Sequence, residues 1–168
     1  MGHDFDLPTP PSPYDGDTSP ASLGRQMTRR IATAIDIDAP AAAIWRVLVD
    51  FPAYPEWNPF IRRITGEAKV GSRLEVTAQP ANRKPMTFRP TVRVANTDRE
   101  LRWLGRVLLP GIFDGEHAFI IERQAKGCRL RHEETFGGLL VPAFGAMLDD
   151  TARSFAELNV ALKRRVEG

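Results

Sequence analysis

The sequence predicts one α+β domain, in which a long C-terminal helix closes over a curved antiparallel sheet of about seven strands. Three observations predict this fold. Short segments in the middle of the chain alternate apolar and polar residues and are separated by turn residues. The end of the chain repeats apolar residues at helical spacing. Near the start, a short helical stretch follows the first strand.

Length and composition are those of a globular domain. The chain has 168 residues, a length that can bury a core without metals or disulfides. Hydrophobic residues make up 42% and charged residues 26%, as in ordinary globular proteins. Cys128 is the only cysteine, which excludes an intramolecular disulfide. No apolar run reaches the roughly 18 residues of a membrane span, and arginines do not cluster with aromatic residues. We therefore expect a soluble, cytoplasmic protein without stable membrane insertion and without nucleic-acid binding.

Residues 1–27 are expected to form a disordered tail, and residues 28–168 the folded domain. Apolar residues are sparse in the tail, and prolines prevent regular hydrogen bonding there: Pro8, Pro10, Pro11, Pro13 and Pro20. No apolar segment of a secretory signal is present. A polyproline segment that binds a partner protein is the alternative interpretation.

The domain begins with a strand over residues 29–38, in which Ile31, Thr33, Ile35 and Ile37 alternate with other residues. A helix over residues 40–49 follows, with Pro40 in its first turn. Three prolines then limit the chain to turns or one-turn helices: Pro52, Pro55 and Pro59.

Further strands follow before the last helix, and short links between them indicate an antiparallel meander. They are predicted at residues 63–69, 73–79, 86–95, 100–106, 113–123 and 128–136. Pro90 lies inside the third of these segments and favours an edge position or a bulge there.

The last element is a helix over residues 141–166. Its apolar stripe steps by four or three residues and consists of Phe144, Leu148, Thr151, Phe155, Leu158 and Leu162. Such a stripe must be covered, so we expect the helix to lie along the sheet. A curved sheet wrapped around one helix leaves a gap, which is a natural site for an apolar ligand.

Residues 29–166 resemble a known family. The resemblance rests on Ile35–Trp45, on Val49–Phe60, on Phe113–Phe119 and on His132–Leu140. These segments are similar to the helix-grip fold of the START-like superfamily, and more narrowly to the SRPBCC group of polyketide cyclases, dehydrases and lipid transport proteins. The group includes carriers, cyclases, dehydratases and regulators, so the resemblance implies the fold and a hydrophobic pocket, and it leaves the function open.

Strand alternation selects three candidate catalytic residues. It directs His132 and Glu134 inward on the last strand, and His117 inward on the strand before it. A histidine beside a carboxylate in a dry pocket is suited to general acid–base catalysis. The alternative is a polar lining that orients a ligand. The spacing is not that of a metal site, so no metal and no cofactor is expected.

The remaining candidates are residues that would contact an apolar ligand from the sheet and from the last helix. They are Trp103, Phe119, Phe136, Phe144, Met147, Leu148, Thr151 and Phe155.

Three functional hypotheses follow. The first is a carrier or sensor, monomeric or homodimeric, that binds a lipid, a polyketide or an aromatic compound. The second is a cofactor-free cyclase, aromatase or dehydratase that uses His117, His132 and Glu134. The third is an interaction module that acts through the proline-rich tail.

Overall fold

The computed structural model describes residues 28–80, 83–107 and 111–168, with the backbone alone at residues 107 and 144–148. The predicted tail at residues 1–27 lies outside these ranges. The α+β class and the closing helix are confirmed.

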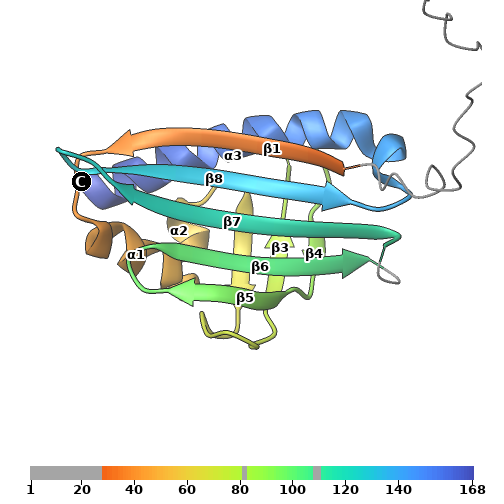
Figure 1. Cartoon of the computed structure of the whole chain (residues 1–168), viewed down its shortest axis with the longest axis horizontal. Helices are drawn as coiled ribbons and strands as arrows, with labels where there is room; N and C mark the ends of the chain where they lie inside the picture. The colour runs from red at the N-terminus through yellow and green to blue at the C-terminus, as the bar shows by residue number, and fades with distance from the viewer. Residues whose placement is uncertain (1–27, 81–82, 108–110) are drawn as a thin grey trace, which may run out of the picture.

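A five-stranded antiparallel sheet forms one wall of the molecule (Figure 1). Its strands, in spatial order, are β1 (Thr28–Ile37), β8 (Cys128–Gly137), β7 (Phe113–Arg123), β6 (Glu100–Val107) and β5 (Thr91–Asn96). The alternation of the sequence explains the sheet, because each strand turns its apolar residues toward one face. On β8, for example, Cys128, Leu130, His132 and Phe136 are buried.

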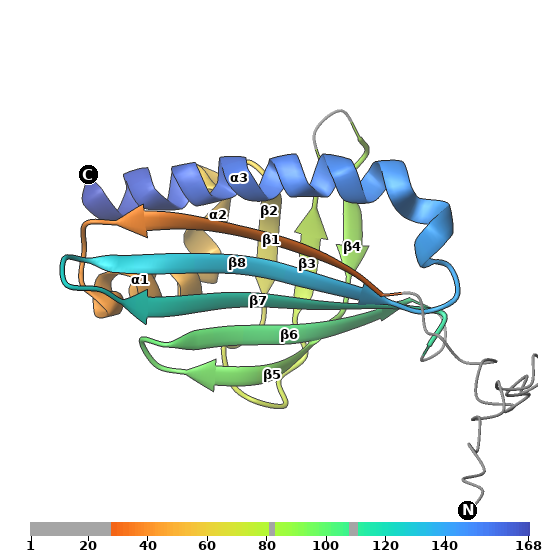
Figure 2. The same cartoon turned by 45° about the horizontal axis from the view of Figure 1, so that its top comes forward.

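A smaller three-stranded sheet lies behind the large one, and its strands run crosswise to it (Figures 1 and 2). It contains β2 (Ile61–Thr65), β3 (Glu75–Ala78) and β4 (Met86–Phe88). Three short helices connect β1 to β2: α1 (Ala41–Val49), η2 (Phe51–Ala53) and α2 (Tyr54–Trp57). Tyr54 fixes this connection, because its buried hydroxyl donates to the carbonyl oxygen of Leu48 at 2.7 Å.

The prediction of a single strand over residues 86–95 is wrong. The chain forms β4 and β5 instead, which belong to different sheets and are separated at Pro90. Proline has no N–H to continue a ladder, so the chain leaves one sheet there and enters the other. The described residues therefore form eight strands in sheets of five and three, rather than about seven in one sheet.

The segment before β3 connects the two sheets. The amide of Leu74 donates to the carbonyl of Pro90 at 2.8 Å. Gly71 donates to the carbonyl of Val92 at 3.0 Å, and Val92 donates to that of Ser72 at 2.9 Å. This segment thus runs alongside β5.

The C-terminal helix α3 (Gly145–Glu167) follows a short turn, η3 (Val141–Phe144), and runs along the β1 side of the large sheet (Figure 2). Its stripe is buried, since Phe155, Leu158 and Leu162 are fully covered. None of the helices in the described ranges is long and apolar enough to cross a bilayer.

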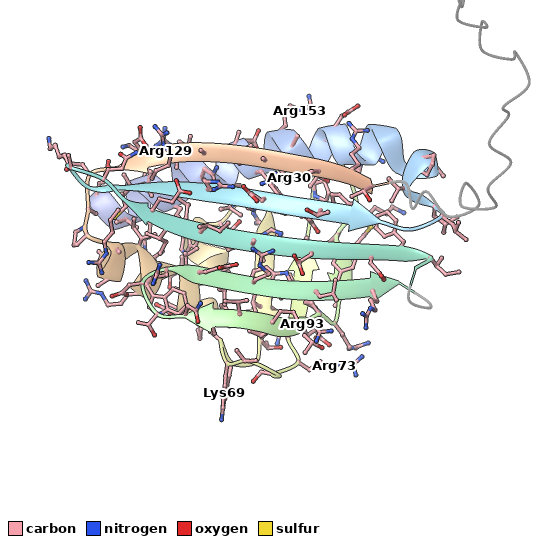
Figure 3. The ribbon with its side chains drawn as sticks, viewed as in Figure 1. Arg30, Lys69, Arg73, Arg93, Arg129 and Arg153 are labelled. Carbon is pink, nitrogen blue, oxygen red and sulfur yellow. The ribbon has the colours of Figure 1, made fainter. Side chains whose placement is uncertain are left out.

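The outer face of the large sheet carries charged residues that pair across strands. Arg129 binds Asp36, Arg131 binds Glu122 and Arg30 binds Glu133. Figure 3 shows Arg30 and Arg129 on this outer face. Any apolar ligand must therefore bind on the opposite, inner face.

Candidate functional site

A cavity of about 440 Å³ lies between the inner face of the large sheet, the small sheet and the start of α3. Its wall is mostly apolar, and its ionisable groups are His117 on β7, Glu134 on β8 and Arg106 on β6. The lining includes Trp103, Gly105, Gly115, His117, Glu134, Phe136 and Thr151.

Two glycines make the large sheet hollow at this point. Gly105 on β6 and Gly115 on β7 are direct register partners and both line the cavity. A Cβ atom on Gly115 would lie 3.0 Å from Oε1 of Glu134. Gly115 therefore gives the Glu134 side chain its room. Sequence reasoning missed this role, and the available signal was a pair of glycines at inward-facing positions on facing strands.

His117 and Glu134 form a pair on the cavity wall. They are register partners on β7 and β8, and His117 Nδ1 lies 3.4 Å from Glu134 Oε2. The imidazole of His117 stacks in parallel on the indole of Trp103, with ring centroids 4.6 Å apart. The ring is thereby held with one edge toward the carboxyl group.

His132 lies behind His117, away from the cavity. It is fully buried, and its Nε2 is 3.0 Å from Nε2 of His117. The ring of Phe155 stacks on it at 3.7 Å. Of the three predicted catalytic residues, the cavity wall includes His117 and Glu134, whereas His132 reaches the cavity only through His117.

Two further polar residues extend this series of hydrogen-bonded side chains from His132 into the protein interior. His132 Nδ1 lies 3.0 Å from Oδ1 of Asn159 on α3. Asn159 Nδ2 donates to Thr33 Oγ1 at 2.9 Å, and that hydroxyl donates to the carbonyl of His132 at 3.3 Å. Sequence reasoning missed this role of both residues. Asn159 follows Phe155 by four residues, so a polar residue beside the buried stripe was the available signal.

Burial sets the protonation of these groups. It lowers the pKa of His117 to about 3 and raises the pKa of Glu134 to about 8. Burial, with the neighbouring His117, also holds the pKa of His132 well below its usual value. At neutral pH both imidazoles are therefore neutral, and Glu134 holds a proton.

The predicted ligand contacts divide into three groups. Trp103, Phe136 and Thr151 line the cavity. Phe119 and Phe155 do not; they pack against His132 instead. The side chains of the other three candidates lie outside the described residues: Phe144, Met147 and Leu148.

The small sheet supplies contacts that sequence reasoning missed. Met86, Phe88 and Val76 line the cavity opposite the His117 and Glu134 side. Arg106 on β6 also lines the cavity, although its side chain is partly exposed. In the described parts of the chain, no group of three or more His, Cys, Asp or Glu side chains is arranged to hold a metal ion.

A family model described as polyketide cyclase / dehydrase and lipid transport matches residues 28–167. No match was found among curated protein sequences. The match covers both sheets and α3, and so includes every residue of the cavity wall.

Several solved structures share the fold. The Zhui aromatase/cyclase from a Streptomyces species has 14% identity and a TM-score of 0.68, over 84% of this chain and 94% of that one. A START superfamily protein from Mycobacterium smegmatis has 22% identity and a TM-score of 0.65, over 82% and 97%. A truncated norcoclaurine synthase from Thalictrum flavum has 15% identity and a TM-score of 0.64, over 84% and 94%. At these identities the likeness concerns the fold alone.

Proposed function

Because the chain belongs to the polyketide cyclase / dehydrase and lipid transport family, we propose that it binds a small, largely apolar ligand, such as a lipid, a polyketide or an aromatic compound, inside its cavity. The cavity itself is the observation that carries this proposal. Removing apolar ligand surface from water supplies affinity, at roughly 25 cal/mol per Å² buried. A few polar groups then fix the orientation of the ligand.

The residue composition of the cavity wall supports a ligand that is apolar over most of its surface and carries a polar group. Apolar side chains from the small sheet, including Met86 and Phe88, face a wall that carries Trp103, His117 and Glu134. A ligand would place its apolar body against the small sheet and its polar group beside Glu134. A location in the cytoplasm and a monomeric or dimeric state remain predictions.

The test is titration with 1-anilinonaphthalene-8-sulfonate, which becomes fluorescent in apolar sites. In Gly105→Leu, the new side chain would extend into the cavity, where the nearest atoms to a Cβ are 3.8 Å away. We expect this variant to weaken probe binding at least about tenfold, or ~1.4 kcal/mol. Gly137→Leu is the matched control, because a Cβ there meets nothing within 4 Å and Gly137 does not line the cavity. Equal binding by both variants and the wild type would place the probe on the surface and contradict the proposal.

A second candidate function is acid–base catalysis on the bound ligand, for example in ring closure or loss of water. The observation that favours it is a carboxyl group 3.4 Å from an imidazole on an apolar wall, where burial raises the pKa of Glu134 to about 8. Oε1 of Glu134 would accept a proton from the ligand while the proton on Oε2 passes to Nδ1 of His117, and the reverse transfers would deliver a proton to a hydroxyl leaving group.

Glu134→Gln separates the two functions, because the amide keeps the shape of the carboxyl but cannot transfer its proton. An enzyme would lose turnover of a polyketone substrate while retaining its binding. A carrier has no turnover to lose and would release an intact ligand. Native mass spectrometry of protein purified from its own host identifies that ligand.

A further inference from the structure

We propose that Thr33, Asn159 and His132 are positioning residues that fix which nitrogen of His117 carries its proton, so that Glu134 offers an acceptor oxygen to a ligand hydroxyl. This inference rests on the proposed ligand site and specifies the polar group that the ligand must carry. It follows from a chain of hydrogen bonds that runs from β1 through α3 to the cavity wall.

The series of hydrogen bonds starts at Thr33. Its hydroxyl has one hydrogen, which it donates to the carbonyl of His132, and its lone pairs then accept the amide hydrogen of Asn159. This fixes the orientation of the Asn159 amide, because the NH₂ group must face Thr33. The amide oxygen consequently faces Nδ1 of His132, at 3.0 Å.

The amide oxygen determines the tautomer of both imidazoles. An oxygen that only accepts requires the hydrogen of His132 to be on Nδ1. A neutral imidazole has one N–H, so Nε2 of His132 is left with a lone pair. Nε2 of His117, 3.0 Å away, must therefore carry hydrogen and donate it. Nδ1 of His117 is then an acceptor.

The acceptor nitrogen in turn orients Glu134. Nδ1 of His117 lies 3.4 Å from Oε2 of Glu134, and two acceptors would repel unless a proton lies between them. The proton of Glu134 is thus placed on Oε2. The burial of both side chains agrees with this state, since it disfavours charge on either group.

The other carboxyl oxygen faces the ligand site. Oε1 of Glu134 lies 3.0 Å from the position that a Cβ atom on Gly115 would take, and both residues line the cavity. With the proton on Oε2, Oε1 is a carbonyl oxygen and can only accept. The complementary ligand group is a donor, such as a hydroxyl on an apolar ring system.

The first test measures the tautomers directly by ¹⁵N NMR of the imidazole nitrogens in the free protein. The chain has only three histidines, and His117→Gln identifies the signals of His117. We expect a proton on Nε2 and a bare Nδ1 for His117, and the reverse for His132. A proton on Nδ1 of His117 in the wild type would overturn the proposal, without involving any ligand.

Substitutions at Thr33 and Asn159, where the series of hydrogen bonds begins, should then change the tautomer of His117 from a distance. Thr33→Val removes the hydroxyl that orients the amide, so we expect both tautomers of His117. Thr33→Ser keeps the hydroxyl and should keep the wild-type spectrum. Asn159→Asp favours a charged His132, which donates from Nε2 and moves the proton of His117 to Nδ1. Folded variants with an unchanged His117 would show that these residues are only structural.

The second test compares the binding of 2-naphthol and 2-methoxynaphthalene by calorimetry, since they share a ring system and differ in the donor. We expect the naphthol to bind at least about tenfold more tightly. Glu134→Gln should keep this preference, because its amide donates to His117 and leaves an acceptor oxygen; Glu134→Leu should abolish it. Equal affinities in the wild type would overturn the acceptor role. If neither probe binds, the proposed function and this ligand class fail together, whatever the tautomers.

Discussion

The inner face of β7 and β8 is filled at one end and hollow at the other. At the filled end, Ile121 and Leu130 belong to a continuous buried cluster with Leu158 and Leu162 of α3. At the hollow end, the corresponding inward position on β7 is Gly115, and the cavity takes the place of a side chain. The same strands and the same alternation therefore build a core and a binding site. The difference lies in side-chain size and in where the polar residues stand.

The largest effect is expected from replacing one isoleucine at the filled end and one isoleucine on the cavity wall. Ile121→Ala leaves a new void in a filled core, and we expect a loss of about 4 kcal/mol in the free energy of unfolding. Ile61 on β2 is also buried but lines the existing cavity, so Ile61→Ala removes fewer contacts and should cost about 2 kcal/mol. Denaturation in urea measures both values. Equal losses would mean that the hollow end is as tightly packed as the filled one.

The hollow end should also control how stability depends on pH. Glu134 keeps its proton up to a pKa of about 8 in the folded protein, but releases it near its usual 4.5 when unfolded. The folded state thus holds more protons between these values, and the contribution of Glu134 to stability falls as pH rises through them. His117 acts oppositely: unfolding lets it bind a proton below its usual 6.5, whereas its folded pKa is about 3. His132 adds to the histidine effect.

The two effects together predict a maximum of stability near pH 6.5. Above it, the slope approaches at most about 1.4 kcal/mol per pH unit, because one carboxyl is responsible. Glu134→Gln should flatten the curve between pH 6.5 and 8 and steepen the rise between pH 4.5 and 6.5, because Glu134 opposes the histidine effect in that range. Thermal unfolding across this range is the measurement, and a wild type with no decrease above pH 6.5 would contradict the buried, protonated state of Glu134.

Two adjacent glycines offer a finer test of the hollow end. Gly115→Ala places a Cβ atom 3.0 Å from Oε1 of Glu134 and should displace that side chain. We expect binding of 2-naphthol to weaken about tenfold. Gly105→Ala is the control, since its Cβ would meet no atom closer than 3.8 Å and should leave the affinity within about twofold. Similar losses in both variants would assign the effect to cavity volume.

The smallest effect is expected on the outer face. Arg129 binds Asp36 at 2.8 Å, but both side chains are about half exposed. Arg129→Gln should leave the free energy of unfolding nearly unchanged, because water screens an exposed ion pair. Its binding of 2-naphthol should match the wild type. A larger loss in either measurement would show that the outer face supports the cavity across the sheet.

The fold was largely predictable, because it depends on patterns that repeat along the chain. The alternation on β7 and β8 and the stripe of α3 required no knowledge of tertiary contacts. The failure at Pro90 was also local: the sequence indicated a break or bulge, but which sheet each half joins depends on partners distant in the chain.

The candidate site was only partly predictable. His117 and Glu134 could be placed by alternation, since they belong to neighbouring strands joined by a short turn. The roles of Thr33 and Asn159 behind this pair could not be predicted, because these two residues are 126 positions apart and meet only through tertiary packing. The position of His132 behind His117 depends on the register and rotation of both rings, which strand alternation does not determine.

The segment that connects the two sheets has a consequence for association between molecules. A strand at the border of a sheet exposes unpaired amides and carbonyls, which can recruit a strand from another chain and start aggregation. Residues 71–74 already bond to Pro90 and Val92 from that side, so the first part of β5 has its hydrogen-bonding groups occupied within the molecule. The first part of β5 is therefore protected from pairing with a strand of another molecule.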